Sequence, residues 1–271
     1  MELIELLEPV IKLASEAGKA IAAIYESGDF EALEKSDDTP VTTADLAAND
    51  IIMAGLQQLA VSYPIQSEEE EILPLAEREH WHRYWLIDPL DGTGEFIQRS
   101  GDFAVNIALI ENNQPVMGVI FAPISGVVYA AVKGKCVFKR DAKGTQTDIS
   151  ARKLAGEDIG KLRFAISRRQ KLEVITDCIP SDLPTEFIPF GSSTLKSCMV
   201  AEGAADCYVR FGPTGEWDTG AAECIVREAG GTVTNLALEP LSYNERESLE
   251  NPNFMVVADA DYPWGDVIRY R

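Results

Sequence analysis

The run from Tyr84 to Thr93 joins two acidic side chains to residues that let a chain turn sharply. An apolar stretch ends on Asp88, a proline follows, and Asp91 comes three residues later, ahead of a glycine. Since proline fixes φ and glycine frees it, the backbone can turn tightly and direct both carboxylates to one point. With the backbone carbonyl of Leu90 they would form a cluster of hard oxygen ligands. Such ligands suit Mg²⁺ better than zinc or copper, so the pattern predicts a magnesium site.

Gly92 and Thr93 follow these carboxylates directly. They offer backbone N–H groups and a hydroxyl where a phosphate would sit. Phosphoryl transfer needs positioning and charge neutralisation more than a covalent nucleophile, so the pattern indicates metal-assisted hydrolysis of a phosphate ester. We expect Thr93, hydrogen-bonded to a carboxylate such as Asp45, to orient and deprotonate the attacking water.

Two more acidic residues are candidate metal ligands. Asp218 begins a helical stretch of small residues, where a helix N-cap would be its simplest role. Glu68 opens a run of four glutamates, a pattern typical of a solvated face, but it alone directly follows an apolar stretch. With the two aspartates of the turn, these residues would form an all-oxygen cage for two or three Mg²⁺ ions. Metals ~3.5–4 Å apart can clamp both the attacking and the leaving oxygen.

Other chemistries find less support. The D-x-D-G-T motif of the haloacid-dehalogenase phosphatases is absent, because two residues separate Asp88 from Asp91. His80 and His82 lack a nearby cysteine or third histidine, which favours a surface turn over a zinc site. The glycines around Thr93 match neither a P-loop nor a dinucleotide fingerprint, and no motif supports a Ser-His-Asp triad.

Composition limits the partners. The chain has 271 residues, 46% hydrophobic and 25% charged, with a net charge of −20. Such a charge argues against nucleic acid or an anionic membrane as an electrostatic partner, and an anionic substrate would need bound cations.

Five cysteines without C-x-x-C spacing indicate buried reduced thiols. With no basic leader and no bilayer-long apolar run, we expect a cytoplasmic protein. The sequence gives no signal for oligomeric state.

Hydrophobic periodicity predicts the elements of the first half. An apolar stripe predicts a helix over most of the first 26 residues. A second helix is expected to start with Thr43 as N-cap, and its apolar face to comprise Ala48, Ile52, Leu56 and Leu59. Beyond the aspartate turn, consecutive strands in an antiparallel meander are expected at 103–111, 115–121, 126–132 and 136–138.

The chain changes character around 150–161, after which strands and helices alternate. Strands are expected at 164–167, 187–190, 206–211, 231–234 and 254–258, and helices near 170–178, 193–202 and 218–229. This pattern predicts two halves, residues 1–155 and 156–271, that meet at a shared cleft and form one catalytic unit.

Together the motifs resemble the inositol monophosphatase superfamily. The matching segments are Asp88–Thr93, Trp217–Ala222, Pro40–Asp45, Ser67-Glu68, Gly191–Ser193 and Asn251–Phe254. The resemblance implies a mixed α+β or α/β fold, a layered αβαβα sandwich like that of inositol monophosphatase and fructose-1,6-bisphosphatase.

Within that superfamily, four features resemble the CysQ-type 3′(2′),5′-bisphosphate nucleotidases. They are Leu90, Glu95-Phe96, Lys196 and Arg210–Pro213. The branch implies Mg²⁺-dependent removal of the 3′-phosphate of adenosine 3′,5′-bisphosphate, or of its sulfated precursor, leaving AMP in the former case, within sulfate assimilation. It also implies inhibition by lithium. Peripheral attachment to the inner membrane is ascribed to the family, but nothing in this sequence supports it.

The resemblance implies roles for individual residues. Glu68, Asp88, Asp91, Asp218 and the carbonyl of Leu90 match the metal ligands, and Asp45 and Thr93 match the water-activating pair. Gly92, Thr93 and Ser192 are expected near phosphate, and Lys196 and Arg210 near the second phosphate or the nucleotide. The whole set expected to contact substrate is Glu68, Leu90, Asp91, Gly92, Thr93, Ser192, Lys196, Arg210 and Asp218. One departure is Gly94, where many sequences of the branch carry lysine.

Two alternatives stay open at this point. An inositol or other sugar-phosphate phosphatase would use the same metal site and differ in substrate preference. An acidic metal-binding or scaffold protein without catalysis is disfavoured, because every ligand and Thr93 are present.

Overall fold

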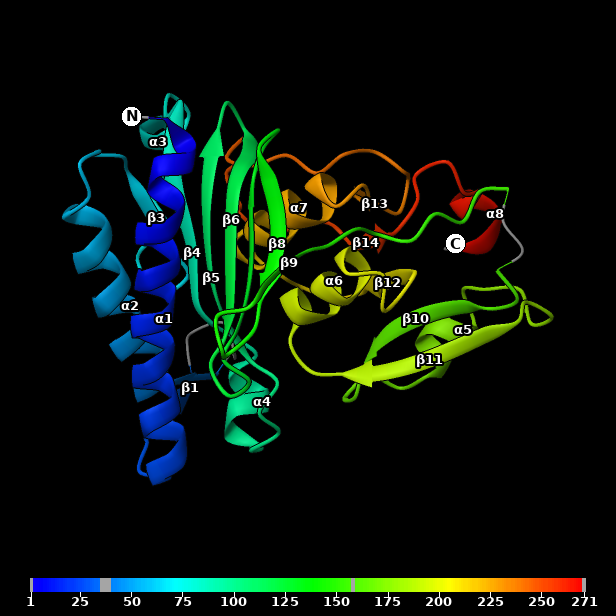
Figure 1. Cartoon of the computed structure of the whole chain (residues 1–271), viewed down its shortest axis with the longest axis horizontal. Helices are drawn as coiled ribbons and strands as arrows, with labels where there is room; N and C mark the ends of the chain where they lie inside the picture. Colours follow the sequence, from blue (N-terminus) through cyan, green and yellow to red (C-terminus); the bar gives the residue numbers. More distant parts are fainter. Residues whose placement is uncertain (1, 35–39, 157–158, 270–271) are drawn as a thin grey trace.

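The computed structural model describes residues 2–34, 40–156 and 159–269. Two sheets lie side by side, and helices cover and separate them (Figure 1). The helices are α1 (Leu3–Ser27), α2 (Thr43–Gln57), α3 (Leu75–Arg78), α4 (Thr93–Ile97), α5 (Glu173–Thr176), α6 (Ser193–Ala201), α7 (Trp217–Glu228) and α8 (Trp264–Val267). A two-stranded ribbon joins β1 (Ala32–Glu34) to β2 (Pro40–Thr42).

The seven-stranded sheet has the order β3-β4-β5-β6-β7-β8-β9. Its strands are β3 (Ile65–Ser67), β4 (Arg83–Asp91), β5 (Ala104–Glu111), β6 (Gln114–Ala122), β7 (Val127–Val132), β8 (Cys136–Arg140) and β9 (Gln146–Asp148). From β4 to β9 every neighbouring pair is antiparallel, which confirms the predicted meander. β9 was not predicted, and its short exposed segment carries little hydrophobic signal.

The five-stranded sheet has the order β11-β10-β12-β14-β13. Its strands are β10 (Leu162–Ser167), β11 (Thr185–Phe190), β12 (Cys207–Arg210), β13 (Thr232–Asn235) and β14 (Phe254–Val257). β10 pairs in parallel with β11 and β12, whereas β14 runs antiparallel to β12 and β13. The expected alternation of strands and helices is confirmed, but the helix expected near 170–178 is a single turn, α5. The division at residue 155 remains a prediction.

A hydrophobic core lies on each face of the seven-stranded sheet, and these two cores hold the helices against it as layers. Because side chains alternate along a strand, β5 serves both cores: Val105, Ile107 and Leu109 pack in the core with α1 and α2, whereas Ala108 and Ile110 pack in the core with α6 and α7. Figure 1 shows α1 and α2 on one side of the seven-stranded sheet, α6 and α7 between the sheets, and α5 and α8 at the far end. The predicted layered α/β architecture is confirmed.

Helix α2 begins one residue earlier and ends sooner than predicted. Thr42, not Thr43, is the N-cap of α2: its hydroxyl accepts from the Ala44 N–H, and Asp45 closes a capping box. Leu59 lies beyond the last residue of α2, so only the other three expected apolar positions are buried on this helix. Within the described ranges, no helix combines the length and apolarity that crossing a bilayer requires.

The histidines lie at the surface, and the cysteines differ in their exposure. His80 and His82 are exposed in the segment between α3 and β4, as expected for a surface turn. All five cysteines are free thiols; Cys198, Cys207 and Cys224 are buried, but Cys136 and Cys178 are half-exposed, which corrects the expectation of five buried thiols.

Candidate active site

The aspartate turn is part of a strand rather than a loop after one. β4 continues through Asp91, and its pairing with β5 shifts register between Asp88 and Asp91. Such an irregularity re-aims side chains. The Asp88 Oδ1 atom accepts from the N–H of Leu90 at 2.9 Å, and its Oδ2 accepts from Asn106 Nδ2 at 3.3 Å. The predicted convergence therefore comes from a local break in the ladder, supported by an asparagine on the neighbouring strand.

Helix α7 brings the third aspartate to this point. It lies close to the seven-stranded sheet because it meets the sheet at glycines: a Cβ on Gly220 would lie 3.2 Å from the Ala108 Cβ, and one on Gly118 would lie 2.2 Å from the Ala221 carbonyl oxygen. Asp218 is the second residue of α7 and accepts from the Gly215 N–H at 2.7 Å. The N-cap position belongs to Glu216, so Asp218 is not a simple cap.

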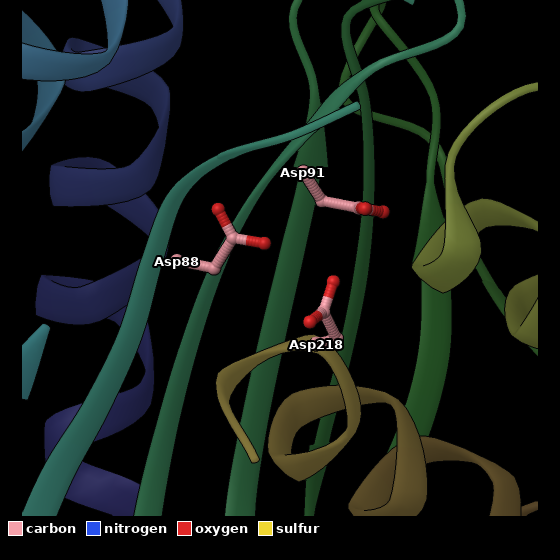
Figure 2. Close-up of side chains that lie close together, drawn as sticks. All are labelled: Asp88, Asp91 and Asp218. Atoms are coloured by element: carbon pink, nitrogen blue, oxygen red, sulfur yellow. The ribbon is translucent and has the colours of Figure 1, made fainter. Parts of the chain in front are cut away.

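Asp88, Asp91 and Asp218 converge, with oxygen atoms that all lie within 4.8 Å of one another (Figure 2). Asp88 has no exposed surface, and Asp91 is buried. Burial and the neighbouring carboxylates, including that of Glu68, raise the pKa of Asp88 and of Asp218 well above the usual range. A largely buried, all-oxygen group of like charges fits a hard divalent cation, whose charge would relieve this repulsion.

The end of β3 positions Glu68. Ser67 donates its hydroxyl to Asn49 Oδ1 at 2.7 Å, and Asn49 donates to Glu70 Oε1 at 2.8 Å. These bonds tie the start of the acidic run to α2. Glu68 is partly buried and lines the same pocket as the three aspartates, whereas Glu70 and Glu71 are exposed.

Thr93 and Asp45 form the expected hydrogen bond across 48 residues. The Thr93 hydroxyl donates to Asp45 Oδ1 at 2.9 Å, and the backbone N–H and hydroxyl of Thr42 donate to Asp45 Oδ2 at 2.8 and 2.6 Å. Burial raises the pKa of Asp45, and these hydrogen bonds oppose the rise. The capping box of α2 thus fixes a carboxylate that can hold a proton behind the Thr93 hydroxyl.

The N-terminus of α6 anchors Asp91 from the other side. Ser192 and Thr194 both donate hydroxyls to Asp91 Oδ2, and the Thr194 N–H donates to the same atom at 2.9 Å. Ser192 adopts a φ of +53°, unusual for a residue with a side chain, which marks it as a constrained position. Lys196 donates to the Ser192 carbonyl at 2.5 Å, and burial lowers the pKa of Lys196 to about 8.

These groups line one pocket of about 910 Å³. All but one of the residues expected at the site line it: Glu68, Asp88, Leu90, Asp91, Gly92, Thr93, Ser192, Lys196, Arg210 and Asp218. The exception is Asp45, which is buried behind Thr93. Sequence reasoning missed three contributors: Asn106, Thr194 and Arg169. A lone asparagine inside the apolar stretch of β5 was an available signal for the first, and the serine motif before α6 for the second.

The sequence profile described as the inositol monophosphatase family matches residues 2–260. The chain belongs to the inositol monophosphatase family. Its similarity to curated members extends over almost the whole length: it is 42% identical to the 3′(2′),5′-bisphosphate nucleotidase CysQ of Aggregatibacter actinomycetemcomitans, covering 97% of this chain and 96% of that one. It is also 42% identical to CysQ of Escherichia coli K12, covering 93% and 99%.

Solved structures of the inositol monophosphatase family share the fold. CysQ from Bacteroides thetaiotaomicron, a bacterial member of the family, has a TM-score of 0.79 and 37% identity, covering 94% of this chain and 97% of that one. The family is metal-dependent, and the cluster of Asp88, Asp91 and Asp218 in this chain is consistent with that property.

Proposed function

We propose that this chain is a 3′(2′),5′-bisphosphate nucleotidase that hydrolyses the 3′-phosphate of adenosine 3′,5′-bisphosphate to leave AMP. The observation that carries the proposal is the similarity, above 40% identity and nearly full-length, to curated CysQ nucleotidases. A pocket with convergent carboxylates supports it. The resemblance of the motifs to this branch extends the proposal to the sulfated precursor as a second substrate and to sulfate assimilation as the setting.

Five groups of this chain would hold two or three Mg²⁺ ions. They are the carboxylates of Glu68, Asp88, Asp91 and Asp218 and the carbonyl of Leu90. The all-oxygen donor set favours Mg²⁺ over softer metals. When bound, the ions offset the negative charge of the phosphate and lower the pKa of the attacking water.

Thr93 and Asp45 would move the proton of that water. Its oxygen attacks phosphorus, and its proton passes to the Thr93 hydroxyl, which donates its own proton to Asp45 Oδ1 along the existing 2.9 Å hydrogen bond. The bond between phosphorus and the 3′ oxygen breaks, and that oxygen takes up a proton from a solvent water to become the hydroxyl of AMP. A carboxylate whose pKa is raised by burial suits a general base.

The other pocket residues would position the substrate. Gly92 and Thr93 face the pocket at the start of α4, where the first N–H groups of a helix have no partner within it. The Ser192 hydroxyl lies beside Asp91, and Lys196 and Arg210 supply positive charge to the walls. This charge matters because the cluster and the −20 net charge repel an anion.

A sugar-phosphate phosphatase with the same metal site is not favoured, because the curated relatives at 38–44% identity over nearly the whole chain are nucleotidases. A cytoplasmic setting is part of the proposal, supported by five free thiols. The −20 net charge supports the expectation that nucleic acid is not a partner.

The test is phosphate release from adenosine 3′,5′-bisphosphate and inositol 1-phosphate in parallel, with Mg²⁺, with EDTA and with Mg²⁺ plus Li⁺. The proposal expects fast, Mg²⁺-dependent, Li⁺-sensitive release from the nucleotide and little from the inositol ester. A preference for inositol 1-phosphate would overturn the substrate assignment, and undiminished release in EDTA would overturn the metal assignment.

A further inference from the structure

Gly94 leaves room for an arginine from the other half of the chain. A Cβ at this position would lie 1.9 Å from Nη1 and 3.0 Å from Cζ of Arg169. Gly94 lies inside helix α4 without the positive φ that calls for glycine, and a glycine inside a helix costs about 1 kcal/mol relative to alanine. The Arg169 guanidinium therefore occupies the place that a side chain at position 94 would take, and such a side chain would displace it.

Arg169 differs from the other arginines nearby. Arg168 forms an ion pair with Asp102, and Arg210 donates to the Pro213 carbonyl. Among the described residues, the Arg169 guanidinium has neither a carboxylate nor a carbonyl partner, although acidic residues outnumber basic ones by 44 to 24 in this chain. It lines the same pocket as the three aspartates. A cation that enters an acidic pocket without an internal partner is suited to bind an anionic ligand there.

The bisphosphate has two anionic groups, and different positive charges would neutralise them. The reacting phosphate lies at the carboxylate cluster, where divalent cations would neutralise its charge. The second phosphate requires a cation from the protein. Lys196 and Arg210 each use one donor on a backbone carbonyl, whereas the Arg169 guanidinium has no such partner among the described residues. A guanidinium suits this role because its planar N–H groups can hold two phosphate oxygens at once.

We propose that Arg169, admitted by Gly94, binds the phosphate that is not cleaved and so determines the preference for bisphosphates over monophosphates. This inference rests on the proposed nucleotidase function. It also accounts for the departure at Gly94: the positive charge that a lysine would bring to this point arrives from the loop after β10 instead.

The test compares adenosine 3′,5′-bisphosphate with adenosine 3′-monophosphate, which lacks the second phosphate. Arg169→Ala is expected to raise KM for the bisphosphate by about 10- to 100-fold, as for the loss of a charge-assisted hydrogen bond, and to change KM for the monophosphate by less than about threefold. The kcat for both is expected to stay within about threefold. Lys171→Ala removes the same charge from an exposed residue of the same loop outside the pocket and is the matched control, expected to behave like wild type.

Gly94 offers a second, independent test. Gly94→Ala keeps every charge but displaces the guanidinium, so it is expected to raise KM selectively for the bisphosphate. Gly94→Lys in the Arg169→Ala background is expected to recover part of the lost affinity. Calorimetry gives a readout without turnover: AMP, which keeps the 5′-phosphate, is expected to bind Arg169→Ala more weakly than wild type, whereas adenosine binds both equally.

Equal losses on both substrates, or no loss on either, would overturn the role of Arg169 while leaving the nucleotidase function intact. Wild-type protein that is inactive on the bisphosphate but active on another phosphate ester would overturn both proposals.

Discussion

Replacing Asp88 by asparagine is expected to stabilise the protein when no metal is present. Its carboxylate has no exposed surface, and oxygens of two other aspartates lie within 4.8 Å. At an effective dielectric constant of about 20, two unit charges at this separation repel each other by about 3 kcal/mol. Burial and these charges raise the pKa of Asp88 well above its unfolded value. An acid whose pKa is raised by folding lowers stability at pH values above the unfolded pKa, so ionised Asp88 destabilises the fold at pH 7.

The substitution keeps one hydrogen bond of this position and exchanges the other, because the Asn106 amide must turn over to present its oxygen in place of Nδ2. The remaining oxygen still accepts from the Leu90 N–H, and the new amide can donate to Asn106 Oδ1, which has no partner in the present arrangement. Partial protonation of the cluster already relieves some repulsion in the wild type, so we expect a net gain of about 2–4 kcal/mol. For a chain of this size that corresponds to a rise in Tm of roughly 5–15 °C in EDTA.

Thermal unfolding followed by circular dichroism at pH 7, in EDTA and then in Mg²⁺, measures this effect. Wild type is expected to gain stability from Mg²⁺ and Asp88→Asn to gain little, because binding to the folded state alone raises stability. Asp50→Asn removes an exposed carboxylate of α2 and controls for net charge. A variant that melts below wild type in EDTA, or that responds to Mg²⁺ as wild type does, would refute the electrostatic reasoning.

Three further changes test other parts of the account. Thr93→Ala should lower kcat by about 10²- to 10⁴-fold while keeping the Mg²⁺-induced rise in Tm. Thr93→Ser should restore turnover. A normal kcat in the alanine variant would exclude the proton path to Asp45. Thr42→Val removes a hydrogen bond that lowers the pKa of Asp45, so this pKa should rise. The acid limb of the plot of kcat/KM against pH should therefore move to higher pH. A limb that does not move would argue against Asp45 as the base. Burial raises the pKa of Glu216 to about 7, so wild type should lose ~3 kcal/mol of stability as pH rises from 4.5 to 7. Glu216→Gln should flatten that slope in urea titrations at several pH values, and an unchanged slope would assign the loss to other groups.

Local pattern was sufficient to predict most elements of the fold. The apolar stripe of α1 reflects packing on one face, and the nearly continuous apolar run of β5 reflects packing on both faces, so the sequence predicted both elements. The start of α2 was off by one residue, because Thr42 and Thr43 are equally good caps in sequence and only the hydrogen bond to the Ala44 N–H distinguishes them. Helix α5 is shorter than predicted, because only one of its apolar residues, Ile175, is buried and can stabilise the helix by packing.

The site was predictable where the chemistry is local and not where it depends on packing between distant segments. The spacing of Asp88 and Asp91 already indicated a shared ligand point, and the two lie on one strand. Their distance from Asp218 depends on glycines that let α7 approach the sheet, which no local pattern reports. Arg169 was missed for the same reason, since its contact with Gly94 joins segments that lie far apart in the sequence.

The most direct test of the central claim follows the oxygen of the attacking water. Adenosine 3′,5′-bisphosphate is turned over with Mg²⁺ in water enriched in oxygen-18, and the products are examined by phosphorus NMR and mass spectrometry. Attack of water on the 3′-phosphorus predicts one labelled oxygen in the inorganic phosphate and unlabelled AMP that retains its 5′-phosphate. Label in the nucleoside, or adenosine 3′-monophosphate as the product, would contradict the account.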